Sequence, residues 1–175
     1  MEVSRIMRIV ACVALITFNA LTASPALATC PGQQKGKPSS RFILNGGEVL
    51  DKETGLNWQR CSLGMRWKDG KGCLGERRFL NLEEATKLAE RAGSGWRLPS
   101  LTELGSLVDD RCGTPAVDNI TFPDIGPPDD AMESPYWTSS PAVAGLFYFV
   151  DFMTGRADAH SKGFELAVRL TRSKH

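Results

Sequence analysis

The stretch Trp96-Arg97-Leu98-Pro99-Ser100-Leu101-Thr102-Glu103-Leu104 decides the fold. Ser100 can accept hydrogen bonds from first-turn amides, and Glu103 follows three residues later, which is the pattern of a capping box. Apolar residues then recur at helical spacing, at Leu101, Leu104, Leu107 and Val108. We therefore expect a helix over residues 101–108 with one face packed inward. The stretch sets structure and carries no catalytic chemistry.

Four further signals keep a fixed order with this stretch: Asp51 to Gln59 (DKETGLNWQ), Phe122-Pro123, Tyr136 to Ser140 (YWTSS), and Val150 to Gly155 (VDFMTG) with Val168-Arg169-Leu170. The ordered set, over roughly Arg41 to Arg172, resembles the bacterial Lcl C-terminal domain family, typified by the Legionella collagen-like adhesin. The resemblance implies a C-type-lectin-like fold, homotrimers and binding of sulfated glycosaminoglycans. The chain has no collagen-like Gly-X-Y repeat.

The first 28 residues have the pattern of a secretory signal peptide. Arg5 and Arg8 form a positive n-region, residues 9–21 are mostly apolar, and Ala26-Leu27-Ala28 is a small-x-small cleavage site. The apolar run is too short to span a membrane comfortably. We expect a signal peptide at 1–28, a tail at 29–40, and one domain at 41–175 that is exported to the periplasm or secreted. A lipid anchor at Cys30 is the second choice.

The charge balance argues against nucleic-acid binding. The chain has 21 basic and 20 acidic residues, and the signal segment holds Arg5, Arg8 and Glu2. The remaining residues therefore have no formal net charge, whereas a nucleic-acid-binding domain is usually basic. A chain of this length is large enough to bury one core of its own.

Four cysteines remain after the signal segment: Cys30, Cys61, Cys73 and Cys112. An even number in an exported chain indicates two disulfides, for which three pairings exist. We favour Cys61–Cys73, because these residues bracket a short glycine-rich loop, and this leaves Cys30–Cys112. The alternative is a zinc site, although no Cys-x-x-Cys pair supports it.

The order of predicted elements indicates an α+β domain with two short helices, a small and mostly antiparallel sheet, and long loops. Strands are expected at 42–44, 48–51, 56–60, 136–140, 146–152 and 165–171, with 156–160 as the return arm of a hairpin. A first helix should run from Leu82 to Ala92 between the cap Asn81 and the stop Gly93. We expect a long loop at 62–78 and no internal repeat. Trp58, Trp96 and Trp137 are expected in the core.

Residues 66–78 form the strongest candidate binding segment. They carry five basic and two acidic residues. The candidate ligand-binding residues are Arg66, Trp67, Lys68, Lys71, Arg77 and Arg78. Trp67 could stack on a sugar ring while the cations pair with sulfate or phosphate groups. The alternative is a solvated charged loop with Trp67 folded onto the core.

An acidic stretch offers a second candidate site, this one for calcium. Its carboxylates are Asp109, Asp110, Asp118, Asp124, Asp129 and Asp130. Calcium prefers six to eight oxygen ligands. The Glu-Pro-Asn and Trp-Asn-Asp motifs of calcium-dependent lectins are absent from the sequence, so we expect no metal and no cofactor, and we interpret these residues as turn and cap residues.

Catalysis is not expected. Only His160 and the terminal His175 follow the signal segment. His160, oriented by Asp151 or Asp158 beside Ser139, would make a triad-like set, but nothing in the spacing requires it. The sequence therefore predicts a non-catalytic, adhesin-like binding module for an anionic, sulfated glycan or another envelope component. The alternative is an accessory domain that contacts protein in an envelope assembly.

Overall fold

The computed structural model describes residues 30, 37–126 and 134–173. The expected signal peptide, most of the tail, and Asp129 and Asp130 lie outside the described residues.

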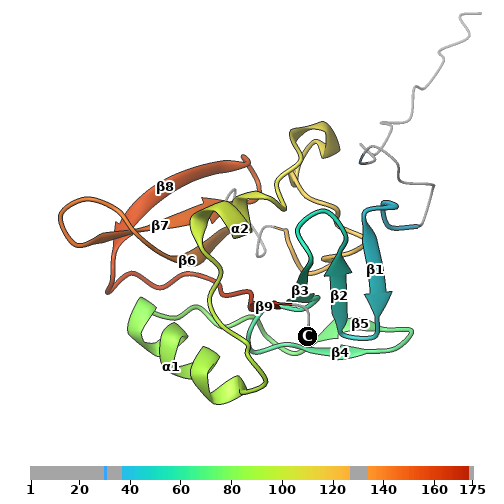
Figure 1. Cartoon of the computed structure of the whole chain (residues 1–175), viewed down its shortest axis with the longest axis horizontal. Coiled ribbons are helices and arrows are strands. Elements are labelled where there is room, and N and C mark those ends of the chain that lie inside the picture. Colours follow the sequence, from blue (N-terminus) through green and yellow to red (C-terminus); the bar gives the residue numbers. More distant parts are fainter. Residues whose placement is uncertain (1–29, 31–36, 127–133, 174–175) are drawn as a thin grey trace, which may run out of the picture.

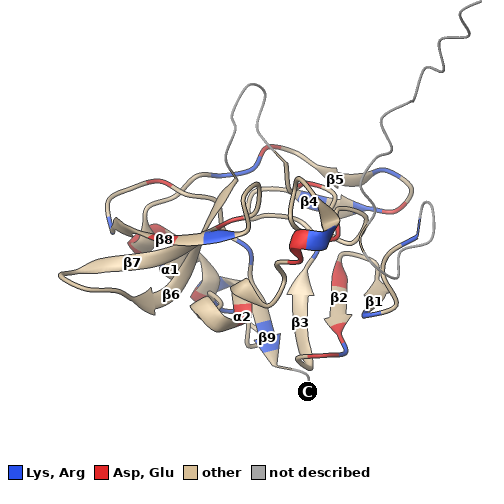
Figure 2. Cartoon of the chain, turned by 90° about the horizontal axis from the view of Figure 1, so that it is seen from above, with Lys and Arg blue, Asp and Glu red and all other residues tan. Residues whose placement is uncertain are grey.

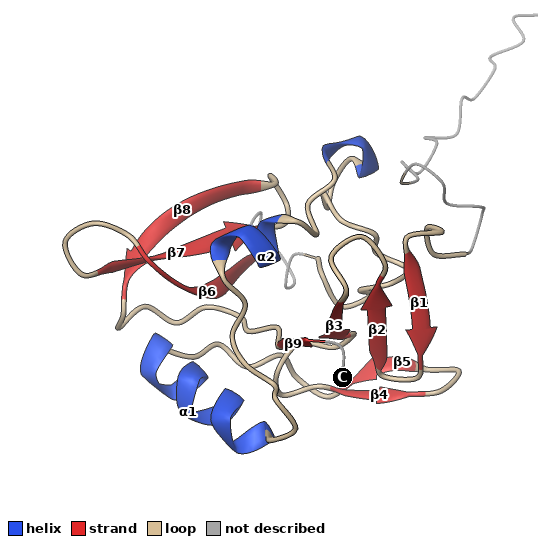
Figure 3. Cartoon of the chain, in the orientation of Figure 1, coloured by secondary structure: helices blue, strands red, loops and turns tan. Residues whose placement is uncertain are grey.

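Three antiparallel sheets and two short helices make up the described part of the chain (Figures 1 and 3). The largest sheet has the order β1-β2-β3-β9, with bounds Phe42–Asn45, Glu48–Asp51, Leu56–Gln59 and Thr171–Ser173. The second sheet has the order β6-β7-β8, with bounds Pro135–Pro141, Leu146–Asp151 and Arg156–Ser161. Strands β4 (Arg66–Lys68) and β5 (Gly72–Leu74) pair as a hairpin. The α+β prediction is confirmed.

The helices begin and end where the sequence predicts, with one difference. Helix α1 (Leu82–Ala92) has the Asn81–Glu84 capping box and ends at Gly93. Helix α2 (Leu101–Gly105) has the Ser100–Glu103 capping box but ends three residues earlier than expected. Leu107 is still buried, because a turn after α2 returns it to the core.

The turn after β2 and the turn after β7 share one geometry, although no internal repeat was expected. Both have the sequence Asp-x-x-Thr-Gly, at residues 51–55 and 151–155. In each turn the Asp carboxylate accepts from the Thr hydroxyl at 2.7 Å, and the Gly amide donates to the Asp carbonyl at 2.8 Å. Both glycines have φ near +70°, a conformation in which a side chain is strained. The same Asp-x-x-Thr-Gly turn thus connects β2 to β3 and β7 to β8.

The strand predicted at 165–171 is wrong for most of its length. Only Thr171 enters a strand, and residues 166–170 run buried between the two larger sheets. Their backbone groups bond to several partners in turn: Leu166 to Leu80, Ala167 to Pro135 and Trp137, Val168 to Leu63, and Leu170 to Gln59. The apolar run is therefore a buried connector, because no single neighbouring strand accompanies it.

Two hydrophobic clusters fill the interior on either side of this connector. One cluster lies under the four-stranded sheet and includes Trp58, and the other lies between α1 and β6 and includes Trp137. Both tryptophans are fully buried, as predicted. Trp96 is only partly buried: it packs against the edge of the second cluster and beside Arg172, so it borders the core and is not inside it.

Both predicted disulfides are confirmed. Cys30 bonds to Cys112 and Cys61 bonds to Cys73. The first ties the segment before the domain to the short 3-10 helix Asp110–Cys112. The second ties β5 to the end of β3.

We predict that Glu103→Gln makes the free energy of unfolding less dependent on pH at acidic pH. The hydrogen bonds from Arg97 lower the pKa of Glu103 from 4.5 to about 2. Because the pKa is lower in the folded state, this carboxylate stabilises the fold above pH 4.5, and the contribution is lost between pH 4.5 and about 2. The pair is partly exposed, so we expect about 0.5–1 kcal/mol.

Urea unfolding across that pH range measures this effect. The matched variant Glu90→Gln replaces an exposed residue of α1 and should keep the wild-type slope. Equal pH slopes for Glu103→Gln and wild type would contradict the assignment.

Candidate functional site

A disulfide-tied hairpin replaces the long loop expected at 62–78. Strand β4 pairs with β5 in the register Arg66 to Leu74, Trp67 to Cys73 and Lys68 to Gly72. The tip contains Asp69-Gly70, with Gly70 at φ +72°. The Asp-Gly pair is a strong hairpin signal that could have revealed this element from the sequence.

Trp67 is the middle residue of β4 and pairs with Cys73 of β5. The buried guanidinium of Arg60 lies 3.6 Å from the centre of its ring. Arg60 is fixed in turn by the carbonyls of Gly46, Ile120 and Thr121. The indole N–H donates to Asp69 at 2.7 Å. Trp67 is thus held in one orientation while its side chain remains partly exposed.

Three of the predicted cations are exposed on the hairpin. Arg66 and Lys68 flank Trp67 along β4, and Lys71 is at the tip. In Figure 2, where Lys and Arg are blue and Asp and Glu are red, both colours occur on the part of the chain labelled β4 and β5. The arrangement presents exposed positive groups around an aromatic ring held by Arg60 and Asp69.

The other two predicted cations point elsewhere. Arg77 is directed inward, where it donates to the hydroxyls of Ser134 and Tyr136 and to the Gly126 carbonyl. Arg78 is exposed and borders a shallow hollow of ≈ 250 Å³ with Lys87 and other residues of α1. The structure therefore brings together four of the six predicted residues, and places Arg77 and Arg78 outside that group.

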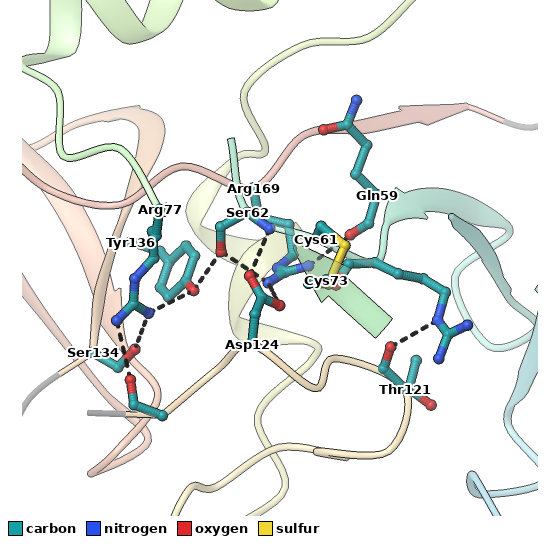
Figure 4. A network of polar contacts seen from close by, with 12 residues as sticks. Gln59, Cys61, Ser62, Cys73, Arg77, Thr121, Asp124, Ser134, Tyr136 and Arg169 are labelled. Carbon is teal, nitrogen blue, oxygen red and sulfur yellow. Dashed lines mark hydrogen bonds and ion pairs between the residues drawn. A yellow bond between two sulfur atoms is a disulfide. The ribbon is translucent and has the colours of Figure 1, made fainter. Parts of the chain in front are cut away.

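A buried polar network lies behind the hairpin (Figure 4). Arg169 is fully buried and pairs with Asp124 at 2.7 Å, and it also donates to the Gln59 carbonyl and the Ser62 hydroxyl. Burial alone would raise the pKa of Asp124, but the charge of Arg169 and hydrogen bonds from Ser62 outweigh it and lower that pKa. The network continues through Ser62 and Tyr136 to Arg77. Ser62 follows Cys61 in the chain, so the network lies next to the disulfide that ties the hairpin.

A groove adjoins the hairpin on the outer face of the four-stranded sheet. It has a volume of ≈ 560 Å³. Its lining includes Asn45, Glu48, Gln59, Trp67, Trp96 and Arg172. Sequence reasoning missed five of these six residues, because they come from separate segments of the chain. The outward polar positions of β1, β2 and β3 were the signal that could have marked this face.

Three carboxylates of the acidic stretch are bonded to protein groups. Asp109 pairs with Arg111, and Asp118 accepts from the amides of Ser39, Ile120 and Thr121. Asp124 is the partner of Arg169. Within residues 30, 37–126 and 134–173, no cluster of three or more His, Cys, Asp or Glu side chains has a metal-binding arrangement.

The residues of the triad-like set, Ser139, His160 and Asp151, each contact a different neighbour. His160 stacks on Phe164, with ring centres 3.6 Å apart. The Ser139 hydroxyl donates to the Pro99 carbonyl. Asp151 accepts from Ser134 and from its own turn. The three side chains therefore do not form a chain of hydrogen bonds of the kind that a catalytic triad needs.

The comparisons with known proteins identify the chain's family. A search of curated protein sequences gave no significant match. None of the helices in the described part is long and apolar enough to cross a membrane. The family model described as the Lcl C-terminal domain matches residues 47–172, which run from β2 into β9 and include both helices and the hairpin, whereas β1 precedes the match. The chain therefore belongs to the Lcl C-terminal domain family, a family associated with adhesins.

Proposed function

We propose that this protein is a non-catalytic, adhesin-like module that binds an anionic glycan, or a similarly charged envelope component, on the β4–β5 hairpin. One observation carries the proposal. The hairpin exposes Arg66, Lys68 and Lys71 around a Trp67 ring that Arg60 and Gly47 hold in place. A ring fixed before binding loses little conformational freedom when a sugar stacks on it.

The disulfide between Cys61 and Cys73 supports the proposal. The Cys61–Cys73 bond fixes β5 to the main sheet, so the hairpin keeps its shape without ligand. Gly47 lies against Trp67 so closely that an added Cβ would be 2.9 Å from the Trp67 Cβ. Exposed ammonium and guanidinium groups pair well with sulfate, but salt screens them. Binding should therefore be modest per protomer and sensitive to salt.

Arg77 and Arg78 lie outside the group of cations on the hairpin, and we assign them different roles. Arg77 uses its guanidinium in internal hydrogen bonds, so we assign it a structural role in the buried network. Arg78 is exposed and stays in the proposed ligand-binding set. The family further suggests a C-type-lectin-like fold, export and a homotrimer, and a trimer would multiply modest contacts through avidity.

The variant Lys68→Glu/Lys71→Glu should elute from a heparin column at clearly lower salt than wild type. Both ammonium groups are exposed on the hairpin, so reversal replaces attraction with repulsion. We expect at least a tenfold loss of affinity, because each lost ion contact is worth about 0.5–1 kcal/mol and repulsion adds to it.

The control is Lys52→Glu/Lys162→Glu, which changes net charge equally at exposed sites off the hairpin. Equal retention of both variants would exclude the hairpin as the anion site. Loss of retention in the hairpin variant alone would support it. A stable protein partner recovered from envelope extract, with no heparin retention by wild type, would favour the accessory-domain alternative.

A further inference from the structure

The groove beside the hairpin has the composition of a site for an uncharged ring. Three neighbouring strands each contribute one planar polar side chain to it: Asn45 from β1, Glu48 from β2 and Gln59 from β3. Asn45 pairs with Glu48, and Glu48 pairs with Gln59, in the sheet register. Because directly opposed residues have Cβ atoms about 4.5–5.5 Å apart, the three groups form a continuous row of donors and acceptors.

Two tryptophans border this row. Trp67 stands on the hairpin side, and Trp96 stands beside β9. Each ring is held by an arginine, with Arg60 3.6 Å from the Trp67 centre and Arg172 4.5 Å from the Trp96 centre. Both side chains are partly exposed. Aromatic rings flanking amide and carboxylate groups suit a polyhydroxylated ring, which has apolar C–H faces and a rim of hydroxyls.

The charges in the groove largely offset one another. Arg172 donates to the Glu48 carboxylate at 2.7 Å, so these two charges form a pair. Arg66 remains at the hairpin edge. The hairpin tip therefore suits an anionic substituent, whereas the row of Asn45, Glu48 and Gln59 suits hydroxyls. The volume of ≈ 560 Å³ lies in the range typical of small-molecule sites.

We propose that this groove binds one uncharged sugar unit of a glycan whose anionic substituents contact the adjacent hairpin. The inference rests on the proposed function in taking a glycan as the ligand. It adds a subsite whose contacts are stacking on the rings and hydrogen bonds to the uncharged hydroxyls of the sugar. Those contacts are much less sensitive to salt than the ion pairs of the hairpin.

The test is a titration with neutral trisaccharides of glucose, mannose, galactose and N-acetylglucosamine, followed by nuclear magnetic resonance of the indole N–H groups. We expect one sugar to shift the Trp67 and Trp96 signals equally at low and high salt. Asn45→Ala and Gln59→Ala should each weaken that binding about tenfold, because each removes hydrogen bonds to hydroxyls. Neither change removes a buried side chain.

Two controls separate the groove from the hairpin. Asn57→Ala changes the same outer face of β3 outside the groove lining, and should leave the titration unchanged. Lys68→Glu/Lys71→Glu should keep the neutral-sugar shifts while it loses heparin retention. If no trisaccharide moves either indole signal at millimolar concentration, or if Asn45→Ala and Gln59→Ala bind as wild type does, the groove proposal is overturned. Heparin retention by the wild type would then still stand as a separate result.

Discussion

Asp124→Ala is expected to lower the free energy of unfolding by about 3–5 kcal/mol, because it leaves a buried charge without its partner. The side chains of Arg169 and Asp124 are 0% and 2% exposed, and their ion pair is 2.7 Å long. The Asp124 carboxylate also accepts from the Ser62 amide at 2.6 Å. Chemical denaturation with both disulfides intact measures the effect.

A double variant distinguishes a lost charge balance from a general disruption of packing. Asp124→Ala/Arg169→Met removes both charges and should recover much of the loss, since a buried ion pair replaced by apolar groups is often close to neutral. The matched single control is Asp158→Ala, which removes an exposed carboxylate that bonds to the amide of Ala159. A loss below about 1 kcal/mol for Asp124→Ala would contradict the buried pair.

Trp137→Ala should also cost about 3–5 kcal/mol, for a different reason. The Trp137 ring is fully buried between α1 and the buried connector, in contact with the cluster that contains Ala85, Leu166 and Val168. Its indole N–H donates to the Leu80 carbonyl at 2.8 Å. The substitution removes apolar contacts, opens a cavity and deletes this hydrogen bond.

Trp137→Phe provides the comparison for this prediction. It keeps most of the apolar volume and loses the hydrogen bond, so we expect a smaller destabilisation of about 1–2 kcal/mol. Thermal unfolding of both variants under one set of conditions gives the difference. Similar losses for Ala and Phe would show that packing of the ring contributes little.

Local signals in the sequence predicted most of the elements. The capping residues Asn81 and Ser100 start helices where expected, and the Asn-Gly-Gly turn joins β1 to β2. These features depend on hydrogen bonds between residues close in sequence, so the order of neighbouring residues is enough to predict them. The cysteine pairing was likewise predicted, because a short loop favours closure of Cys61–Cys73.

Long-range partners decided the features that the sequence did not predict. Residues 166–170 look like a strand, but their backbone bonds go to four separate segments. Arg77 looks like a surface cation, yet Ser134, Tyr136 and Gly126 bind it inside. The groove likewise depends on the register of three strands and on the position of Trp96. No local pattern specifies such contacts, because they arise only when distant segments pack together.

A glycan array with the oxidised domain, at low and physiological salt and with and without a calcium chelator, tests the central claim most directly. The proposed hairpin site predicts binding to sulfated glycans that weakens as salt increases and does not change with the chelator. Binding that the chelator abolishes would contradict this site and indicate a metal-dependent one instead. An array with no signal from well-folded protein would contradict glycan binding altogether.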